Sequence, residues 1–391
     1  MSATNQVTVS EESPRVHSRE LVLLLCVLAL LILLALTAVL SRLYHKKVHT
    51  MADAMFTQGE ADEQAGNVAA ALADYRNALA YNPGNARFQF NLARALEAAG
   101  RSEEARAYLL NLLSESPGSG AVNLELARIA AHNGSMADAM RYYQSAIYGE
   151  WDADPIAMRW QVRKELCDVL LSRGALKQAA PEVIALQENT PADDFPRLKI
   201  VAQMLLRTQQ WNRVQDLERL LLAADRNDQE SLAGAAEAAF QLAQYQTALG
   251  YFDRLPRETR EQPDLSNQFD MARRVVTADP FLPGLSMEAM ARRAASALAL
   301  AQSRAQSCAR QTGHPLEQTP PQTDLQKQFA QVKNMQRDWS ERNLLRFPDR
   351  VDDAMNFVFN VENAAASACG EPQGDDRALW LLGRSRQAVN R

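Results

Sequence analysis

A constant interval between small residues is the feature of this sequence that most restricts its fold. It separates three glycines, and three alanines keep the same interval: Gly66, Gly100 and Gly134, and Ala71, Ala105 and Ala139. An interval of about 34 residues indicates stacked helical hairpins, in which each hairpin buries its apolar face against the next. The glycine permits a tight turn between two helices, and the small alanine lets them approach closely. The period therefore predicts an all-α chain whose surface holds other molecules.

Further positions follow the same register. Pro83 and Pro117 are separated by the same interval, and each is placed to stop the second helix of its unit. An aromatic residue or a leucine in that helix would fill the space beside the next hairpin: Tyr75, Leu109 and Tyr143. This pattern resembles the tetratricopeptide repeat family over residues 52–153. The resemblance implies a right-handed superhelical solenoid of helix-turn-helix repeats that binds a protein or peptide partner.

The repeat pattern loosens after residue 153. A fourth unit keeps Gly174, Ala179 and Pro191 at their usual spacing, whereas a fifth, around Trp211, lacks both the glycine and the proline. A sixth unit recovers the small residues: Ala236, Ala243 and Ala248. We predict about six units over residues 52–256, of which the fifth departs furthest from the pattern.

Ahead of the repeats lies a long apolar segment. Residues 21–40 carry no charge, and twenty helical residues span roughly 30 Å, the thickness of the hydrocarbon core of a bilayer. The alternative is a cleaved signal peptide, whose apolar core should be about 7–15 residues long and end in a small-residue cleavage site. Neither property is found here. We expect one transmembrane helix over residues 21–44, in a bacterial inner membrane, preceded by a disordered tail over residues 1–20.

The sequence leaves open on which side of the membrane the repeats lie. Positive residues favour the cytoplasm by one charge, since Arg42, Lys46 and Lys47 follow the span and Arg15 and Arg19 precede it. Cys308 and Cys369 favour the opposite side, because a disulfide between them would require an oxidising compartment such as a periplasm. The alternative is that both cysteines are small buried apolar residues. The balance leans towards the periplasm.

The C-terminal third shows no repeat. We expect a linker over residues 257–285, in which the prolines around Phe281 favour extended backbone. A helical domain over residues 286–391 would then cover the open end of the solenoid, because a last repeat without a neighbour leaves apolar surface in water. Its helices are expected at about residues 286–310, 324–345, 349–368 and 377–388.

No catalytic or metal-binding motif emerges from the remaining residues. The five histidines are scattered, and His45 and His49, which share a helical face, have no glutamate beside them. No phosphate-binding glycine loop and no nucleophile elbow occur in the sequence. The net charge of −5 and the lack of a clustered basic stripe argue against nucleic acid as a partner. We expect no enzymatic activity, no cofactor, no metal and no small-molecule substrate.

The resemblance places the binding surface on the concave face of the solenoid. Counting along the first helix of the first three units gives six candidate partner-binding residues: Phe56, Glu60, Phe90, Arg94, Leu124 and Arg128. An apolar strip flanked by arginines would suit an amphipathic helix or an extended peptide. The alternative is that the apolar residues pack inside the solenoid while the charges are solvated.

These expectations favour a membrane-anchored scaffold for protein–protein interaction. The alternative is a non-catalytic assembly subunit of a bacterial envelope machine, such as one for cytochrome maturation, secretion or polysaccharide export. An enzyme in the C-terminal domain is a third hypothesis, which no motif supports.

Overall fold

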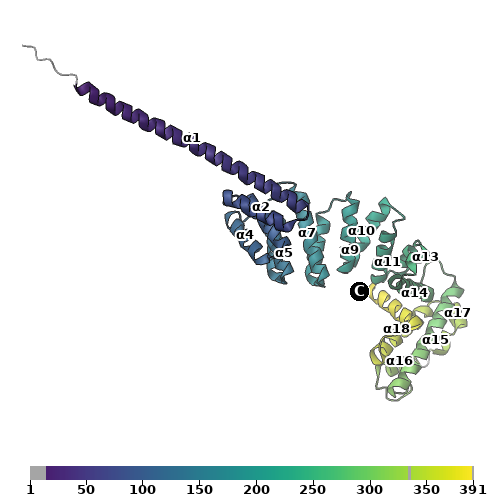
Figure 1. Ribbon diagram of the computed structural model, residues 1–391. Helices are drawn as coiled ribbons and strands as arrows, with labels where there is room; N and C mark the ends of the chain where they lie inside the picture. Colours follow the sequence, from purple (N-terminus) through teal and green to yellow (C-terminus); the bar gives the residue numbers. More distant parts are fainter. Residues whose placement is uncertain (1–14, 333–335, 390–391) are drawn as a thin grey trace, which may run out of the picture. The chain divides into compact units, whose positions relative to one another are not determined.

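The chain is built from helices (Figure 1). The computed structural model describes residues 15–332 and 336–389, and within these ranges the only extended pairing is one isolated bridge between Ser119 and Glu150. The chain divides into two compact units, Met1–Arg163 and Lys164–Arg391.

The first unit begins with one helix of 50 residues, α1 (Arg15–Gln64), drawn in purple in Figure 1. Its N-terminal part is exposed and is long and apolar enough to cross a membrane. From Ala52 onward its side chains enter the core of the repeats. The helix continues past residue 44 because neither proline nor glycine interrupts it before Gly59. The expected disordered tail is therefore wrong for residues 15–20, which are helical, and residues 1–14 lie outside the described residues.

Five shorter helices complete the hairpins of the first unit: α2 (Val68–Tyr81), α3 (Ala86–Ala98), α4 (Ser102–Glu115), α5 (Gly120–His132) and α6 (Met136–Tyr148). Each packs against the helix before it. The side chains of Asn85 and Ser119 cap α3 and α5 by accepting hydrogen bonds from backbone N–H groups that have no partner inside the helix. Small residues sit where helices cross, as the repeat period predicts, and Ala71, Ala105 and Ala139 are fully buried.

A short insertion after α6 folds back on the turn that precedes α5. The backbone of Glu150 donates to the carbonyl of Gly118 at 2.8 Å and accepts from the N–H of Gly120 at 2.9 Å. The ring of Trp151 lies over Gly120, where an added Cβ would approach the indole to 2.4 Å. The Trp151 Nε1 atom donates to the carbonyl of Ala146 at 3.0 Å. The insertion thereby covers one end of the third hairpin.

The second unit continues the helical pairs. The helix α7 (Pro155–Ser172) contains the boundary between the two units. It is followed by α8 (Leu176–Glu188), α9 (Phe195–Arg207), α10 (Trp211–Ala224), α11 (Gln229–Gln241) and α12 (Tyr245–Phe252). The helix α9 packs against α10, and α11 against α12.

The tight turn inside each hairpin uses left-handed backbone. Four glycines, Gly66, Gly100, Gly134 and Gly174, take φ values of 78°, 74°, 80° and 68°. In the next two hairpins Gln209 and Ala243 take φ values of 58° and 59° at the corresponding turn. The fifth unit thus keeps the turn although it has lost the glycine. Because a side chain disfavours left-handed backbone, these two turns are strained.

The expected linker over residues 257–285 is largely helical, which corrects the prediction. It contains α13 (Arg257–Arg260) and α14 (Pro263–Ala278), and its irregular end is confined to residues 279–285. Pro263 occupies the first turn of α14, where its missing N–H costs nothing. Ala272 and Val275 are buried in the core of the C-terminal domain, so that α14 is one of its structural helices.

The C-terminal domain consists of α15 (Met287–Thr312), α16 (Asp324–Val332), the 3-10 helix η1 (Gln336–Trp339), α17 (Glu341–Arg346), α18 (Arg350–Cys369) and α19 (Gly374–Val389). The single helix expected over 324–345 is wrong. Ser340 begins a new helix by accepting a hydrogen bond from the N–H of Asn343, and the buried Trp339 packs on Phe357 with ring centroids 5.5 Å apart. The aromatic contact holds η1 against α18.

Candidate binding surface

Two of the three apolar members of the predicted binding strip lie in the core. Phe56 is 2 % exposed, stacks on Phe88 with centroids 4.7 Å apart and contacts Tyr75 at 5.3 Å. Leu124 is also buried, and Phe90 is half-buried. Residues that recur at the repeat interval on this side therefore pack between hairpins. The expectation of an apolar contact strip is corrected for Phe56 and Leu124.

The charged members of the strip lie at the surface and are joined by ion pairs. Glu60 of α1 accepts a hydrogen bond from the guanidinium of Arg87 on α3 at 2.8 Å. Further along α3, Arg94 lies 3.5 Å from Glu63 of α1. These contacts run from the first helix of one hairpin to the first helix of the next.

The third hairpin extends the same arrangement. Arg94 also lies 3.9 Å from Glu125 on α5, and Arg128 pairs with Glu125 at 2.9 Å. We call this set the charged ladder: Glu60, Glu63, Arg87, Arg94, Glu125 and Arg128. The sequence predicted Glu60, Arg94 and Arg128. Glu63 and Arg87 also fall on the concave face when the first helices are counted, although they are not among the six candidates, and Glu125 completes the set.

A buried tyrosine positions one acid of the charged ladder. The hydroxyl of Tyr75 donates to Glu63 Oε2 at 2.7 Å. Burial, the hydrogen bond to Glu63 and the nearby carboxylates raise the pKa of Tyr75 well above its usual value, so the phenol keeps its proton. Glu63 is therefore held as a hydrogen-bond acceptor between Tyr75 and Arg94.

The ion pairs of the charged ladder are weak enough to be replaced by charge contacts to another molecule. Its arginine side chains are between 41 % and 66 % exposed. Ion pairs at this exposure contribute about 0–1 kcal/mol each, because water screens the charges and the long side chains lose rotational freedom. A partner that supplies charges of both signs could replace these pairs at small cost.

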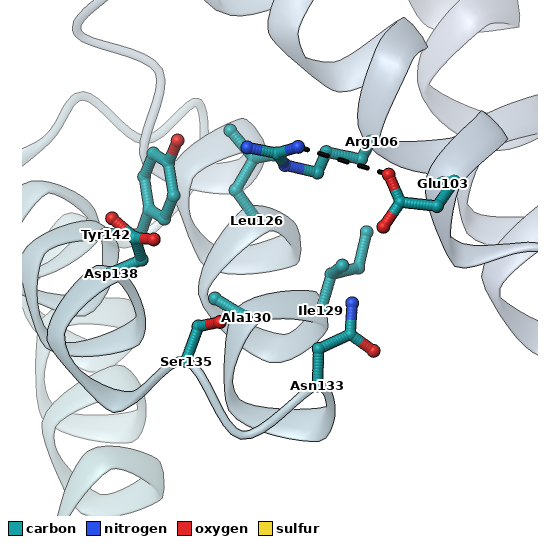
Figure 2. A pocket seen from close by; sticks show the side chains of 9 residues that line it. All are labelled: Glu103, Arg106, Leu126, Ile129, Ala130, Asn133, Ser135, Asp138 and Tyr142. Atoms are coloured by element: carbon teal, nitrogen blue, oxygen red, sulfur yellow. Dashed lines mark ion pairs between the residues drawn. The ribbon is translucent and has the colours of Figure 1, made fainter.

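A cavity of about 480 Å³ lies on another side of the same hairpins (Figure 2). Its lining comes from α4, α5 and α6, with Glu103 and Arg106 opposite Asp138 and Tyr142. Leu126 and other buried apolar residues of α5 form its floor. The residues that line this cavity include no member of the charged ladder.

Buried acids occur in the second unit, outside any motif that the sequence offered. Glu218 of α10 is 2 % exposed, and burial raises its pKa to about 8. It occupies the space left by the missing side chain of Gly234, where an added Cβ would lie 2.4 Å from Glu218 Oε1. Within the described ranges, no group of His, Cys, Asp and Glu side chains forms a metal-binding cluster.

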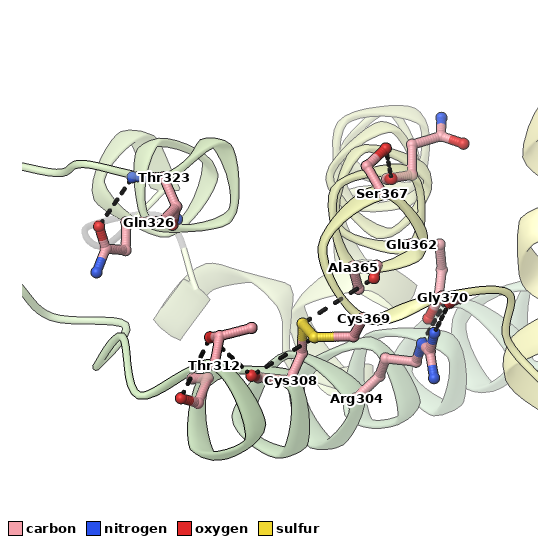
Figure 3. The surroundings of a disulfide bond; sticks show 12 residues. Arg304, Cys308, Thr312, Thr323, Gln326, Glu362, Ala365, Ser367, Cys369 and Gly370 are labelled. Atoms are coloured by element: carbon pink, nitrogen blue, oxygen red, sulfur yellow. Dashed lines mark hydrogen bonds and ion pairs between the residues drawn. A yellow bond between two sulfur atoms is a disulfide. The ribbon is translucent and has the colours of Figure 1, made fainter.

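A second buried acid lies beside the cysteines of the C-terminal domain (Figure 3). The structure bonds the sulfurs of Cys308 and Cys369, whose Cα atoms are 5.8 Å apart. Arg304 donates to the carbonyl of Gly370 at 2.8 Å, and its Nε lies 3.6 Å from Glu362 Oε2. Glu362 is fully buried, and burial raises its pKa to about 8. Arg304 of α15 thus contacts both Glu362 within α18 and Gly370 directly after it.

A family model for the tetratricopeptide repeat matches residues 56–120 and 98–155. These matches cover the hairpins that carry the charged ladder. Residues 56–155 therefore contain tetratricopeptide repeats. No curated protein sequence matches the chain.

Solved structures of tetratricopeptide repeat proteins resemble the fold at low sequence identity. PilF of Pseudomonas aeruginosa is 17 % identical and has a TM-score of 0.38, with 56 % of this chain and 97 % of that chain covered. PilW, described as a type IV pilus biogenesis factor, is 15 % identical and has a TM-score of 0.36, with 55 % and 97 % covered. A repeat protein of Cytophaga hutchinsonii is 14 % identical and has a TM-score of 0.41, with 57 % and 86 % covered.

The tetratricopeptide repeat pattern explains where the side chains of residues 56–155 lie. Their register places the small residues in the core and leaves the charged ladder at the surface. Tetratricopeptide repeat proteins are typically scaffolds for other proteins and lack catalytic activity. The C-terminal domain lies beyond the matched residues, so its surface must be judged from its own geometry.

Proposed function

We propose that this chain is a scaffold that α1 holds at a membrane and that binds a partner protein through the charged ladder. The observation that carries the proposal is the continuity of α1. Its large apolar side chains between Leu21 and Leu40 are 49–68 % exposed, which is costly in water and favourable in lipid. The same helix then buries Ala52 and Phe56 in the first repeat.

This continuity ties the repeats closely to the anchor. Roughly 18 Å of helix separates Leu40 from Ala52, with no glycine or proline that would act as a hinge. A partner at the same membrane would therefore meet the ladder at a raised effective concentration. The rigid hairpins would reduce the conformational entropy lost on binding.

The composition of the ladder defines the partner that fits it. Acids and arginines alternate from Glu60 through Arg94 to Arg128, and half-buried Phe90 adds limited apolar area. A helix or an extended segment with charges of both signs matches this surface better than an apolar helix does. This replaces the apolar strip expected from the sequence.

We also propose that the repeats lie in an oxidising compartment, such as the periplasm of a bacterium with α1 in its inner membrane. Cys308 and Cys369 lie at a distance that suits a disulfide, and disulfides persist in such compartments. In this compartment the scaffold would serve the assembly of a machine of the bacterial envelope.

Photo-cross-linking in intact membranes tests the proposal. A photoreactive residue in place of Arg87 should form defined adducts with one or a few proteins, and the paired change Arg94→Glu with Arg128→Glu should reduce them at least about tenfold. Arg141→Glu is the matched control, since Arg141 is an exposed arginine of α6 that pairs with Asp138 of its own helix. Adducts that survive the ladder variant, with the helical content unchanged, would contradict the proposed binding surface.

A further inference from the structure

Two pairs of adjacent arginines meet at one cavity in the C-terminal domain. Arg273 and Arg274 come from α14, and Arg292 and Arg293 come from α15. Together with the N-terminal part of α19 they surround a volume of about 560 Å³. Volumes of roughly 300–1,000 Å³ are typical of sites that enclose a small ligand or an anchoring side chain.

The floor of this cavity is apolar. It is formed by small and aliphatic residues from all three helices, including Ala278, Ala297, Leu300 and Leu379. Ala297 and Leu379 belong to the buried core of the domain, so the floor is rigid. A leucine or phenylalanine side chain resting there would bury apolar surface without displacing any charged group.

One arginine already shows how the site holds a carboxylate. Arg274 binds the carboxylate of Asp375, which also lines the cavity, at 2.5 Å. Arg293 has a structural task, because it donates to the carbonyls of Val276 and Asp279 at 3.0 and 2.8 Å and so completes the end of α14. The remaining two arginines are less firmly engaged.

Arg273 and Arg292 are exposed and held by weak contacts. Their side chains are 59 % and 68 % exposed. Arg273 pairs with Asp270 one turn away on its own helix, and Arg292 lies 3.8 Å from Glu341. Such pairs contribute about 0–1 kcal/mol, so both guanidinium groups can turn to an incoming anion at little cost. The lining holds four arginines and one carboxylate, and the carboxylates of Asp270 and Glu341 lie beside two of these arginines, so the site keeps a net positive charge.

We infer that this cavity binds an acidic peptide segment of a partner protein, with one apolar side chain on the floor and flanking carboxylates on Arg273 and Arg292. The planar guanidinium group matches a carboxylate with two parallel hydrogen bonds, which favours this ligand over an uncharged peptide. The inference rests on the proposed scaffold function and adds a second contact point, on a domain that the repeat family model does not cover.

The test uses the full chain in a non-ionic detergent and the fluorescein-labelled peptide Glu-Asp-Leu-Asp-Glu, amidated at its C-terminus. Fluorescence anisotropy should give saturable binding below about 100 µM, whereas the neutral peptide Gln-Asn-Leu-Asn-Gln should bind at least tenfold more weakly. Arg273→Gln with Arg292→Gln should also weaken the acidic peptide at least tenfold. Ser296→Glu should do the same, because Ser296 is exposed in the lining and a new carboxylate there would compete with the ligand.

The matched control is Arg257→Gln with Arg310→Gln, two exposed arginines outside the cavity, which should leave binding unchanged. Equal binding of both peptides, or equal binding by the cavity variants and wild type, would overturn the inference. Arginine-dependent binding of laurate without binding of the peptide would overturn it too, in favour of a lipid anion. Cross-linking at the charged ladder uses none of these residues, so the scaffold proposal can survive the loss of this site.

Discussion

Replacing Gln209 by glycine should make the protein more stable. Gln209 adopts a φ of 58° in the turn between α9 and α10, and its side chain is exposed. Left-handed backbone costs a residue with a side chain roughly 1–2 kcal/mol, which glycine avoids. Glycine in turn loses about 0.5–1 kcal/mol more chain entropy on folding. The difference between the midpoints of these ranges predicts a gain of about 0.75 kcal/mol, and the full range runs from about 0 to 1.5 kcal/mol.

Thermal unfolding of the full chain in detergent, followed by circular dichroism, measures this gain. For a unit of this size, 1 kcal/mol corresponds to a rise in Tm of about 2–4 °C. Gln178→Gly makes the same chemical change inside α8 and should lower Tm, because glycine weakens a helix. Gly174→Ala should also lower Tm, since Gly174 has a φ of 68° and open space around it, so only the backbone conformation opposes a side chain. An unchanged or lowered Tm for Gln209→Gly would refute the argument from strain.

Two further predictions concern the buried groups of the second unit. The folded pKa values of Glu218 and Glu362 are about 8 against an ordinary 4.5, so between these values the folded chain holds more protons than the unfolded chain. Stability should therefore fall as the pH rises from about 5 to 8, and Glu218→Gln should reduce this dependence when Tm is measured across that range. Cys308→Ser with Cys369→Ser should lower the free energy of unfolding, measured in urea, by about 4 kcal/mol, because the disulfide closes a loop with a sequence separation of 61 residues. An unchanged free energy of unfolding would mean that the two thiols are free.

The sequence predicted the repeats well because their spacing is set by local geometry. A glycine that recurs at the repeat interval marks a turn that needs left-handed backbone, and the structure places such a turn at Gly66, Gly100 and Gly134. The turns at Gln209 and Ala243 could not be predicted from the sequence, because packing of the neighbouring helices holds these residues in a left-handed conformation that they do not favour. The repeat interval therefore predicts a turn only where the residue in the turn is one that favours left-handed backbone.

The surface was harder to predict than the core. Phe56 and Leu124 recur at one position because they pack between hairpins, and a repeat register alone does not distinguish packing from binding. The arginine cavity was missed for a different reason. Its two arginine pairs belong to different helices, and one of these helices, α14, lies within the range expected as a linker. Only the packing of α14 on the C-terminal core brings the pairs together.

Two signals bear on the side of the membrane at which the repeats lie, and they act at different stages. The positive residues after the span, Arg42 and Lys46 among them, act during insertion, and their excess is a single charge. Long domains can cross a membrane despite such an excess. The cysteine pair acts on the finished fold, because α15 and α18 must pack before Cys308 and Cys369 lie 5.8 Å apart. Since α1 continues unbroken from the span into the repeats, a bridge between these cysteines would locate the charged ladder in the same oxidising compartment.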